Sequence, residues 1–302
     1  MRKLLFICTF VWSATAIFAQ QAPQFTNFMF NKLVYNPAYA GSHEVLTLNA
    51  IYRNQWTGIE GAPVTANFNM HTPFLNNRCG VGLSVISDQI GMVNSTYANL
   101  SYNYRLPVGE KSTLAMGIMG RLEQSSIDWT QSQELDAGDP RIGMGQSSDV
   151  KPNFGAGVYL SSDRYYLGFS VPQLLKNNLY TDLNITENVQ NYYFMGGVVA
   201  DLNKDVKIKP AVLLTYNPSA PFEADFNLNF IFMDALWLGG SYRMGDSFDA
   251  IMAYQFTKQL RGGLAVDFTT SELQDYTSGS FEVMLQYSFV YEKNGVTNLR
   301  FF

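Results

Sequence analysis

The chain is 302 residues long, with 15% charged residues, 15% aromatic residues and a formal net charge of −5. Soluble domains usually carry about 25% charged residues, so this balance disfavours a soluble domain and is typical of a chain with one surface in lipid. A negative net charge offers no basic field to attract phosphates, which argues against a nucleic-acid partner.

The first residues have the features of a secretory signal peptide. Arg2 and Lys3 give a positive start, residues 4–18 form an apolar run, and Ala19 is a small residue before Gln20. We therefore predict a signal peptide over 1–19 that is cleaved on export. An uncleaved anchor is the alternative, but the run is shorter than the about 20 apolar residues that a spanning helix needs. The mature chain then keeps one cysteine, Cys79, so no intramolecular disulfide is expected.

The next stretch, residues 20–43, is poor in charge and rich in aromatic side chains. Its aromatic residues are Phe25, Phe28, Phe30, Tyr35 and Tyr39. Apolar side chains gain by leaving water, so we expect this segment to be a plug in a barrel or a docking element for a partner. A plain lead-in to the first strand is the alternative. Asn36–Pro37 is a turn-forming pair, and Gly41 permits a positive φ.

Segments in which apolar and polar residues alternate recur from 44 to 291. Examples are V-T-A-N-F-N-M-H at 64–71 and F-E-A-D-F-N-L-N-F at 222–230. Successive strand side chains point to opposite faces, so each segment has one apolar and one polar face. We count about 14 such segments, long enough to cross a bilayer at barrel tilt. The sequence predicts an all-β fold, a transmembrane antiparallel β-barrel of the outer membrane over 44–291. Pro210 should weaken pairing or cause a bulge.

The connections between the predicted strands differ in length. The short ones, 73–78, 107–111, 161–164, 203–205, the turn at 234 and 258–259, follow even strands, whereas the long ones, 124–153 and 172–189, follow odd strands. Long loops on one side and tight turns on the other are typical of outer-membrane barrels. With an even strand number both termini fall on the short-turn side, so 20–43 and a tail over 292–302 are predicted to be periplasmic.

Charged residues on the polar faces should point into the barrel lumen. They are Arg53, Arg105, Arg121, Lys207, Lys209, Glu223, Asp225, Arg243, Asp249, Arg261, Asp267 and Glu282. Such charges either select solutes or pair across the lumen and hold a plug, and pairing is the commoner fate.

Residues suited to catalysis are scarce. The chain has two histidines, His43 and His71. His71 shares a polar face with Asn67 and Asn69, so it is most simply interpreted as a hydrogen-bonded residue of the lumen. One mature cysteine and two histidines cannot build a zinc site with standard spacing. We therefore predict no enzymatic activity, no metal and no cofactor.

Several motifs occur in a fixed order along the mature chain. They are Q-A-P-Q-F-T-N-F-M-F-N-K-L-V-Y-N-P-A-Y-A-G at 21–41, Y-R-N-Q-W-T-G-I-E-G-A-P-V-T at 52–65, S-D-Q-I-G at 87–91 and S-G-S-F-E-V-M-L-Q-Y-S-F at 278–289. Together they resemble the PorP/SprF family of type IX secretion membrane proteins of Bacteroidetes. Phe281, where the family would have His, and Leu299, where Pro commonly stands, depart from its pattern.

This resemblance implies a non-enzymatic outer-membrane component of the type IX secretion and gliding apparatus. Some relatives contact a periplasmic peptidoglycan-binding lipoprotein, and others serve the secretion or surface attachment of large adhesins with a type B C-terminal signal. The candidate partner-binding or structural positions are Tyr35, Asn36, Pro37, Tyr39 and Gly41 in the first motif and Gln55, Trp56, Gly61 and Pro63 in the second. The charged lumen leaves a passive outer-membrane channel or solute transporter as the alternative.

Overall fold

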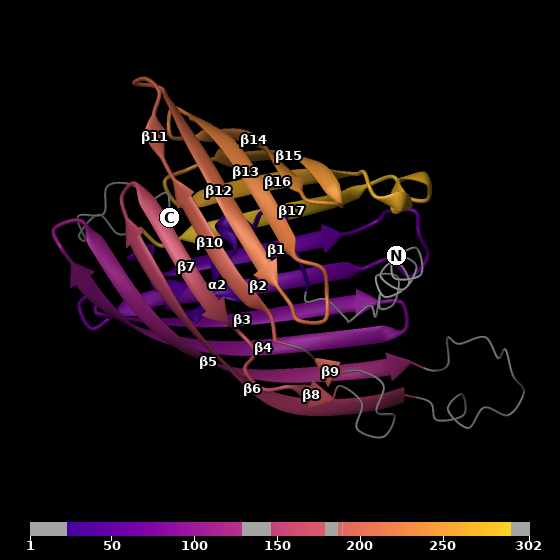
Figure 1. Cartoon of the computed structure of the whole chain (residues 1–302). Helices are drawn as coiled ribbons and strands as arrows, with labels where there is room; N and C mark the ends of the chain where they lie inside the picture. Colours follow the sequence, from indigo (N-terminus) through magenta and orange to yellow (C-terminus); the bar gives the residue numbers. More distant parts are fainter. Residues whose placement is uncertain (1–22, 129–145, 179–186, 189, 291–302) are drawn as a thin grey trace, which may run out of the picture.

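The computed structural model describes residues 23–128, 146–178, 187–188 and 190–290. The predicted signal peptide (1–19), the predicted tail (292–302) and the central parts of the two longest connections lie outside these residues. The described chain forms a closed antiparallel β-barrel of 14 strands (Figure 1). Among the described residues, no helix is long and apolar enough to cross a membrane.

Each barrel strand pairs with the next one along the chain, and the last strand pairs with the first. The first seven strands are β1 (Thr47–Asn54), β2 (Val64–Phe74), β3 (Cys79–Ile90), β4 (Val93–Val108), β5 (Ser112–Asp128), β6 (Gln146–Ser162) and β7 (Tyr165–Val171). The other seven are β10 (Tyr192–Val198), β12 (Val206–Tyr216), β13 (Glu223–Phe232), β14 (Leu236–Arg243), β15 (Ser247–Gln255), β16 (Leu260–Thr269) and β17 (Ser280–Ser288). The pairing of β1 with β17 closes the barrel.

Three short strands lie outside this count. β8 (Asn177–Asn178) and β9 (Glu187–Asn188) form a separate two-stranded sheet in the connection between β7 and β10. β11 (Ala200–Asp201) continues the ladder of β10 along β12, and this ladder is interrupted opposite Pro210, between the pairs Gly197↔Ala211 and Ala200↔Ile208. Proline has no N–H to donate, so the weakened pairing that the sequence predicted occurs here on the side of β10.

The alternation read from the sequence defines the two faces of the wall. Along β2 buried and exposed positions alternate, with Asn67, Asn69 and His71 buried and Phe68 and Met70 exposed. The polar face therefore points inward and the apolar face outward, where it lies against lipid.

The two ends of the barrel differ. We call the end that holds the turns after β2, β4, β6, β13 and β15 the turn end, and the opposite end, which holds 55–63, 217–222 and 270–279, the loop end. In Figure 1 the turn end is on the left and the loop end, with the short helix η4 (Glu272–Asp275), is on the right. Most turn-end connections are tight, and Asn76, Asn77 and Asp234 there adopt positive φ.

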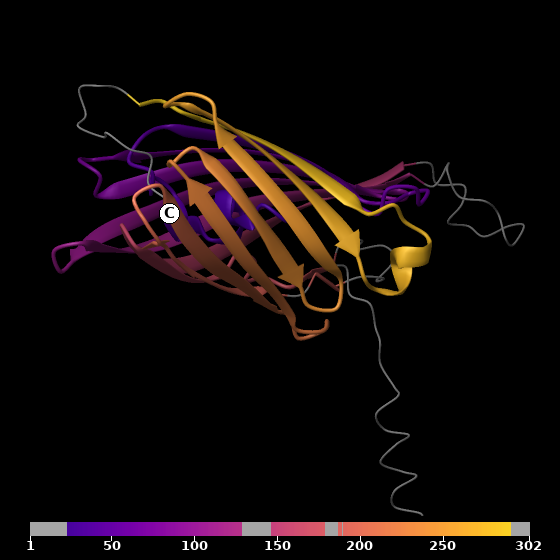
Figure 2. The same cartoon turned by 90° about the horizontal axis from the view of Figure 1, so that it is seen from above.

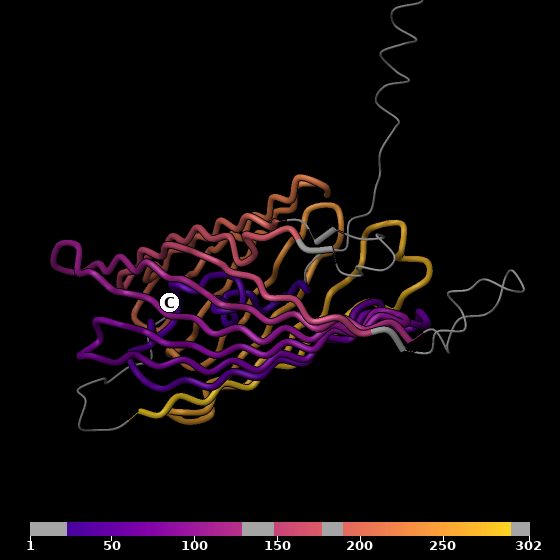
Figure 3. The backbone as a smooth tube through the Cα atoms, turned by 90° about the horizontal axis from the view of Figure 1, so that it is seen from below, coloured from indigo at the N-terminus to yellow at the C-terminus, as the bar shows by residue number. Residues whose placement is uncertain are grey.

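Residues 24–43, which we call the inner segment, lie inside the barrel. They form η1 (Phe28–Phe30), α2 (Lys32–Tyr35) and η2 (Pro37–Tyr39), and every residue from Phe25 to His43 is buried. Figures 2 and 3 show this indigo stretch enclosed by the strands. Its aromatic side chains form one apolar core with wall residues that include Tyr159, Tyr193 and Trp237.

The course of the inner segment corrects one expectation. The sequence placed all of it on the short-turn side, but Gln24 donates to Glu223, which follows the loop-end connection 217–222. The segment then runs along the lumen and reaches the turn end at His43, where β1 begins. Counting strands correctly placed the start of β1 at the turn end. The count carries no information about the course of the chain before β1.

Candidate functional site

A row of five wall residues supports the middle of the inner segment. Strand register aligns Gly80 with Asn103, Asn103 with Gly117, Gly117 with Gly157 and Gly157 with Ser170. The row therefore crosses β3 to β7 and consists of three glycines and two residues with polar side chains. We call these five residues the seat.

The glycines of the seat let the backbone of the inner segment touch the wall. A Cβ added to Gly80 would lie 2.1 Å from the carbonyl oxygen of Ala40, and one added to Gly117 would lie 2.5 Å from the amide nitrogen of Ala38. Both distances are far inside van der Waals contact, so these positions require glycine for steric reasons.

The polar members of the seat bond to carbonyl groups of the inner segment. Asn103 Nδ2 donates to the carbonyl oxygens of Ala38 (2.9 Å) and Ala40 (2.7 Å). Ser170 Oγ donates to the carbonyl oxygen of Tyr35 at 2.7 Å. Buried backbone groups need such partners when they lie outside regular structure, so the seat both admits and pairs the segment.

Asn36 and Pro37 shape the segment for this contact. Asn36 Oδ1 accepts from the backbone N–H of Ala38 at 2.9 Å and caps η2, while its Nδ2 donates to the carbonyl oxygen of Val158 at 2.9 Å. Pro37 follows at the first position of η2, where a missing N–H costs nothing. Asn36 therefore ends the preceding turn through its backbone N–H, which donates to the Lys32 carbonyl, and its side chain starts the next turn and anchors it to β6.

Tyr39 and Gly41 complete the contact near the turn end. The Tyr39 hydroxyl lies 2.9 Å from His43 Nε2, and its ring packs edge-on against His71 with centroids 5.3 Å apart. Gly41, at φ 73°, donates its N–H to His71 Nδ1 at 3.2 Å, and its carbonyl oxygen accepts from Arg105 at 2.8 Å. His71 is thus a hydrogen-bonded lumen residue.

At the loop end the start of the inner segment meets a buried ion cluster of Arg53, Asp267 and Glu282. Register places Arg53 opposite Glu282, and Arg53 Nη2 lies 2.6 Å from Asp267 Oδ2. The two oxygens of Glu282 accept the backbone N–H groups of Thr26 and Asn27, each at 2.9 Å. These side chains are 1–2% exposed, so the charges are compensated by one another and by the segment.

The remaining predicted lumen charges have separate partners. Arg243 Nε pairs with Asp225 Oδ1 at 2.7 Å, and Arg121 Nε donates to Asn99 Oδ1 at 2.7 Å. Asp249 accepts from Ser247. Lys207 lies at the turn-end rim and pairs with Asp234. Lys209 and Arg261 are buried beside Trp237.

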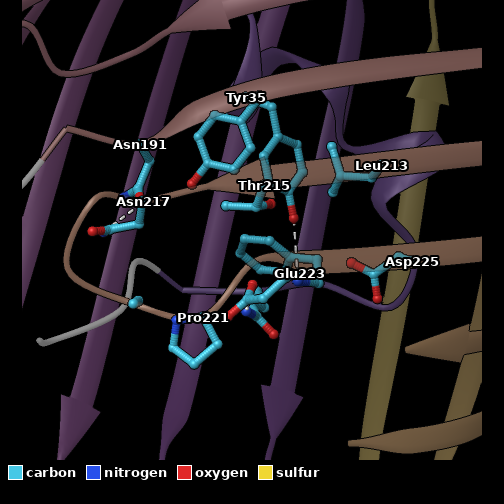
Figure 4. A pocket seen from close by; sticks show the side chains of 12 residues that line it. Tyr35, Asn191, Leu213, Thr215, Asn217, Pro221, Glu223 and Asp225 are labelled. Carbon is cyan, nitrogen blue, oxygen red and sulfur yellow. Dashed lines mark hydrogen bonds between the residues drawn. The ribbon is translucent and has the colours of Figure 1, made fainter. Parts of the chain in front are cut away.

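A small cavity lies where the inner segment begins (Figure 4). Its volume of about 20 Å³ is enough for about one water molecule. Tyr35 and Gln24 of the inner segment line it together with Asn217 of the loop-end connection and Glu223 of β13.

The second motif lies elsewhere. Backbone bonds tie it to neighbouring connections: Gln55 donates to the Pro63 carbonyl, Trp56 to Ser280 Oγ, and Gly91 to the Gly61 carbonyl. Gln55, Trp56, Gly61 and Pro63 hold the first loop-end connection, whereas Tyr35, Asn36, Pro37, Tyr39 and Gly41 lie along the lumen. The structure does not bring the two motifs together.

Sequence reasoning missed the wall side of this site. Asn103, Ser170 and the seat glycines were assigned only to strands, although Gly80 and Gly82 stand at alternate, inward positions where small residues leave room for another chain. Among the described residues, no group of three or more His, Cys, Asp or Glu side chains is placed to hold a metal ion.

The fold defines the class of protein as an outer-membrane β-barrel. The toluene transporter TbuX from Ralstonia pickettii is similar in structure, with a TM-score of 0.53 and 9% identity over 87% of this chain and 93% of that chain. A mutant of the TodX monoaromatic hydrocarbon channel has a TM-score of 0.50 and 11% identity over 85% and 93% of the two chains. At these identities the likeness concerns the fold alone. A search among curated proteins finds no match.

The family is defined by the sequence. The family described as type IX secretion system membrane protein PorP/SprF matches residues 17–287. This match includes the inner segment, the seat and the ion cluster. The chain belongs to the PorP/SprF family, and it is a type IX secretion component of the outer membrane.

Proposed function

We propose that this protein is a non-enzymatic component of the type IX secretion and gliding apparatus that supports the secretion or cell-surface attachment of cargo proteins such as large adhesins. Family membership supports the assignment to the apparatus. The single observation that carries the finer role is the inner segment held on the seat. A barrel whose lumen holds a buried segment of its own chain offers other proteins its ends rather than an open pore.

The inner segment acts in this proposal as a plug that also rigidifies the barrel. Contacts at both ends of the lumen support this, with Glu282 accepting from Thr26 and Asn27 at the loop end and Asn103 and Arg105 donating near the turn end. A wall fixed from inside presents its loops in a constant arrangement, which favours recognition of a protein partner.

The partners in this proposal lie on opposite sides of the membrane. The loop end, with the 55–63 connection braced by Trp56 and Gly61, faces cargo outside the cell. The turn end faces the periplasm, where a peptidoglycan-binding lipoprotein is the proposed partner. The signal-peptide prediction agrees with export to this membrane.

Secretion assays test this proposal. Removing the gene should abolish release of type IX cargo into the medium and display of a large adhesin on intact cells, with a cargo of another secretion route as the control. The wild-type gene and Gly120→Ala, whose added Cβ meets nothing within 4 Å, should restore both. Unchanged release and display in the deletion strain would overturn the proposal.

Planar-bilayer recording separates this role from a passive channel. The purified, folded protein should be silent, and shortening the inner segment should produce conductance. Steady ion conductance by the intact protein would instead favour the channel. An affinity pull-down in mild detergent then identifies the partner, with a co-purifying periplasmic lipoprotein or a large adhesin as the expected result.

A further inference from the structure

A groove lies on the outer face of the wall, across the seam where β17 pairs with β1. Residues of β17, β1, β2 and β3 line it, and its volume is about 420 Å³. Pockets that bind small molecules usually measure about 300–1,000 Å³. We call this hollow the outer groove.

Small outward residues form the floor of the outer groove. In one outward row, Ala50 of β1 lies between Leu285 of β17 and Phe68 of β2. In the next row, Ala66 of β2 lies beside Tyr52 of β1. The three large side chains are exposed, and they border the positions where alanine leaves space. The groove is therefore a consequence of strand register, which sets small and large outward residues side by side.

The lining of the outer groove is almost entirely apolar. Its polar residues are Tyr52, Ser87 and Asn67, and the other lining residues are Ala, Ile, Phe, Val and Leu. The Asn67 amide is already bonded, because its Nδ2 donates to the Val85 carbonyl oxygen at 3.1 Å and its Oδ1 accepts from Asn69 Nδ2 at 2.9 Å. A hydrocarbon ligand therefore matches this lining.

The position of the outer groove indicates what covers it. Apolar outward faces of such barrels lie against lipid. This surface continues on both sides of the groove, where Leu264 of β16 pairs with Val283 and Leu100 of β4 pairs with Leu83. All four of these side chains are exposed. The groove is thus a hollow within a continuous lipid-facing surface.

We propose that the outer groove is a binding site for one acyl chain of a membrane lipid. An apolar cavity of about 150 Å³ holds a benzene molecule, so the volume of the groove suits a chain segment of roughly a dozen carbon atoms. Each methylene that leaves water or detergent for this lining adds to the affinity.

The bound chain links the two ends of the sheet. It contacts Val283 and Leu285 of β17 and Ala50 and Tyr52 of β1 at once, and these two strands close the barrel. A ligand that binds the folded protein alone stabilises it by mass action. Occupancy of the outer groove should therefore raise the Tm of the barrel.

Native mass spectrometry of the full-length protein tests this site. The protein is reconstituted in vesicles of dioleoyl phosphatidylcholine, extracted in a mild detergent and activated by collision until loosely bound lipid is lost. The wild type should retain one phospholipid. Ala66→Leu and Ala50→Leu fill the floor of the groove, and displacing about two methylenes should lower the retained fraction about tenfold.

Ala250→Leu is the matched control. Ala250 is an exposed, outward residue of β15, and it does not line the outer groove. The same Ala-to-Leu change there adds equal apolar volume to the lipid-facing surface, so this variant should retain the phospholipid as the wild type does.

Thermal unfolding in detergent separates recognition of the chain from recognition of the headgroup. Dioleoyl phosphatidylcholine and dioleoyl phosphatidylglycerol should raise Tm saturably and alike in the wild type and Ala250→Leu, and less in Ala66→Leu. Dihexanoyl phosphatidylcholine, with the same headgroup and short chains, should raise Tm less in the wild type. A response that follows the headgroup and ignores chain length would contradict the proposal.

Two further results would overturn the acyl-chain site. One is that the wild type retains no phospholipid, or that Ala66→Leu and Ala50→Leu retain it as well as Ala250→Leu does. The other is that protein purified from its own membranes carries, in place of lipid, a second protein that only the groove-filling variants lose. Two such variants are used so that a folded barrel from either one is sufficient for the comparison.

Discussion

The two halves of the lumen hold the inner segment by different means. In the loop-end half, carboxylates bond to its backbone and are in turn compensated by arginine, as Glu282 and Arg53 illustrate. In the turn-end half, the glycines of the seat, the Asn103 amide and the Arg105 guanidinium hold the same chain. The loop-end contact depends on charge compensation, and the contact at the seat depends on fit. Loss of a charge should therefore destabilise the loop-end half, whereas an added side-chain atom should destabilise the contact at the seat.

The largest loss of unfolding free energy is expected when the ion cluster is broken. Arg53→Met leaves Asp267 and Glu282 buried without their cation, and breaking a buried pair in this way costs about 3–5 kcal/mol. Denaturant titration of the barrel folded in detergent measures this loss of unfolding free energy as a lower midpoint of unfolding.

An exposed ion pair is the control for Arg53→Met. Arg164 pairs with Asp201 at the surface of the turn end, with both side chains about half exposed, so Arg164→Met should change stability little. Equal losses in the two variants would contradict the assignment of the ion cluster as a structural anchor.

A smaller effect is expected at the seat. Gly117→Ala places a Cβ 2.5 Å from the Ala38 amide nitrogen, and overpacking of this kind costs about 1–3 kcal/mol. Gly120→Ala lies on the same strand with nothing within 4 Å of the added Cβ and is the matched control.

Thiol labelling shows whether the seat variant loosens the inner segment. An Ala38→Cys probe in a Cys79→Ser background should react with a maleimide faster in Gly117→Ala than in Gly120→Ala. Equal protection in both would mean that the segment does not depend on its contact with the wall.

Removing the side chain that caps η2 and holds it to β6 should lower the free energy of unfolding still less. Asn36→Ala loses the cap of η2 and the bond to the Val158 carbonyl, and loss of a cap costs about 1 kcal/mol. Asn203→Ala removes similar bonds, to Asp205 and Val206, in an exposed turn. Labelling at Ala38 should increase in the first variant only, and an increase in both would point to general loosening of the barrel.

The smallest effect concerns the coupling between the halves. Because Arg53 and Gly117 share no partner, the combined variant should show a sum of the two losses within about 0.5 kcal/mol. A double-mutant cycle measures this value. A larger coupling energy would mean that the inner segment transmits changes from one end of the lumen to the other.

Much of the wall could be predicted from the sequence. The alternating segment at 64–71 begins where β2 begins, and the predicted connections 161–164 and 203–205 end directly before β7 and β12, because a period of two is a local property of a strand. The predicted connection at 124–153 was too long, since β5 continues to Asp128 and β6 begins at Gln146. The alternation is lost at the end of β5, where Ser125, Ser126 and Ile127 are all buried.

The site was only partly predictable. Y-N-P-A-Y-A-G could be chosen as a motif, and its aromatic content indicated burial, but Asn103 and Ser170 are far from it in sequence. Their relation to Ala38 and Tyr35 depends on the register of five strands, which no local pattern specifies. The position of Gln24 at the loop end likewise follows from its contact with Glu223 and not from strand counting.

The sequence by itself determined that the chain crosses the membrane as strands, which side chains face lipid, which connections share an end, and the family to which the chain belongs. These properties depend on period, length and motif, all of which are local. The tertiary structure alone decided that the inner segment lies along the lumen, that glycines admit its backbone, and that the buried acids of the described residues lie in the loop-end half, where Arg53 and Arg243 compensate them. Those features arise because closing the barrel brings distant inward faces together around a chain whose buried backbone groups need hydrogen-bond partners.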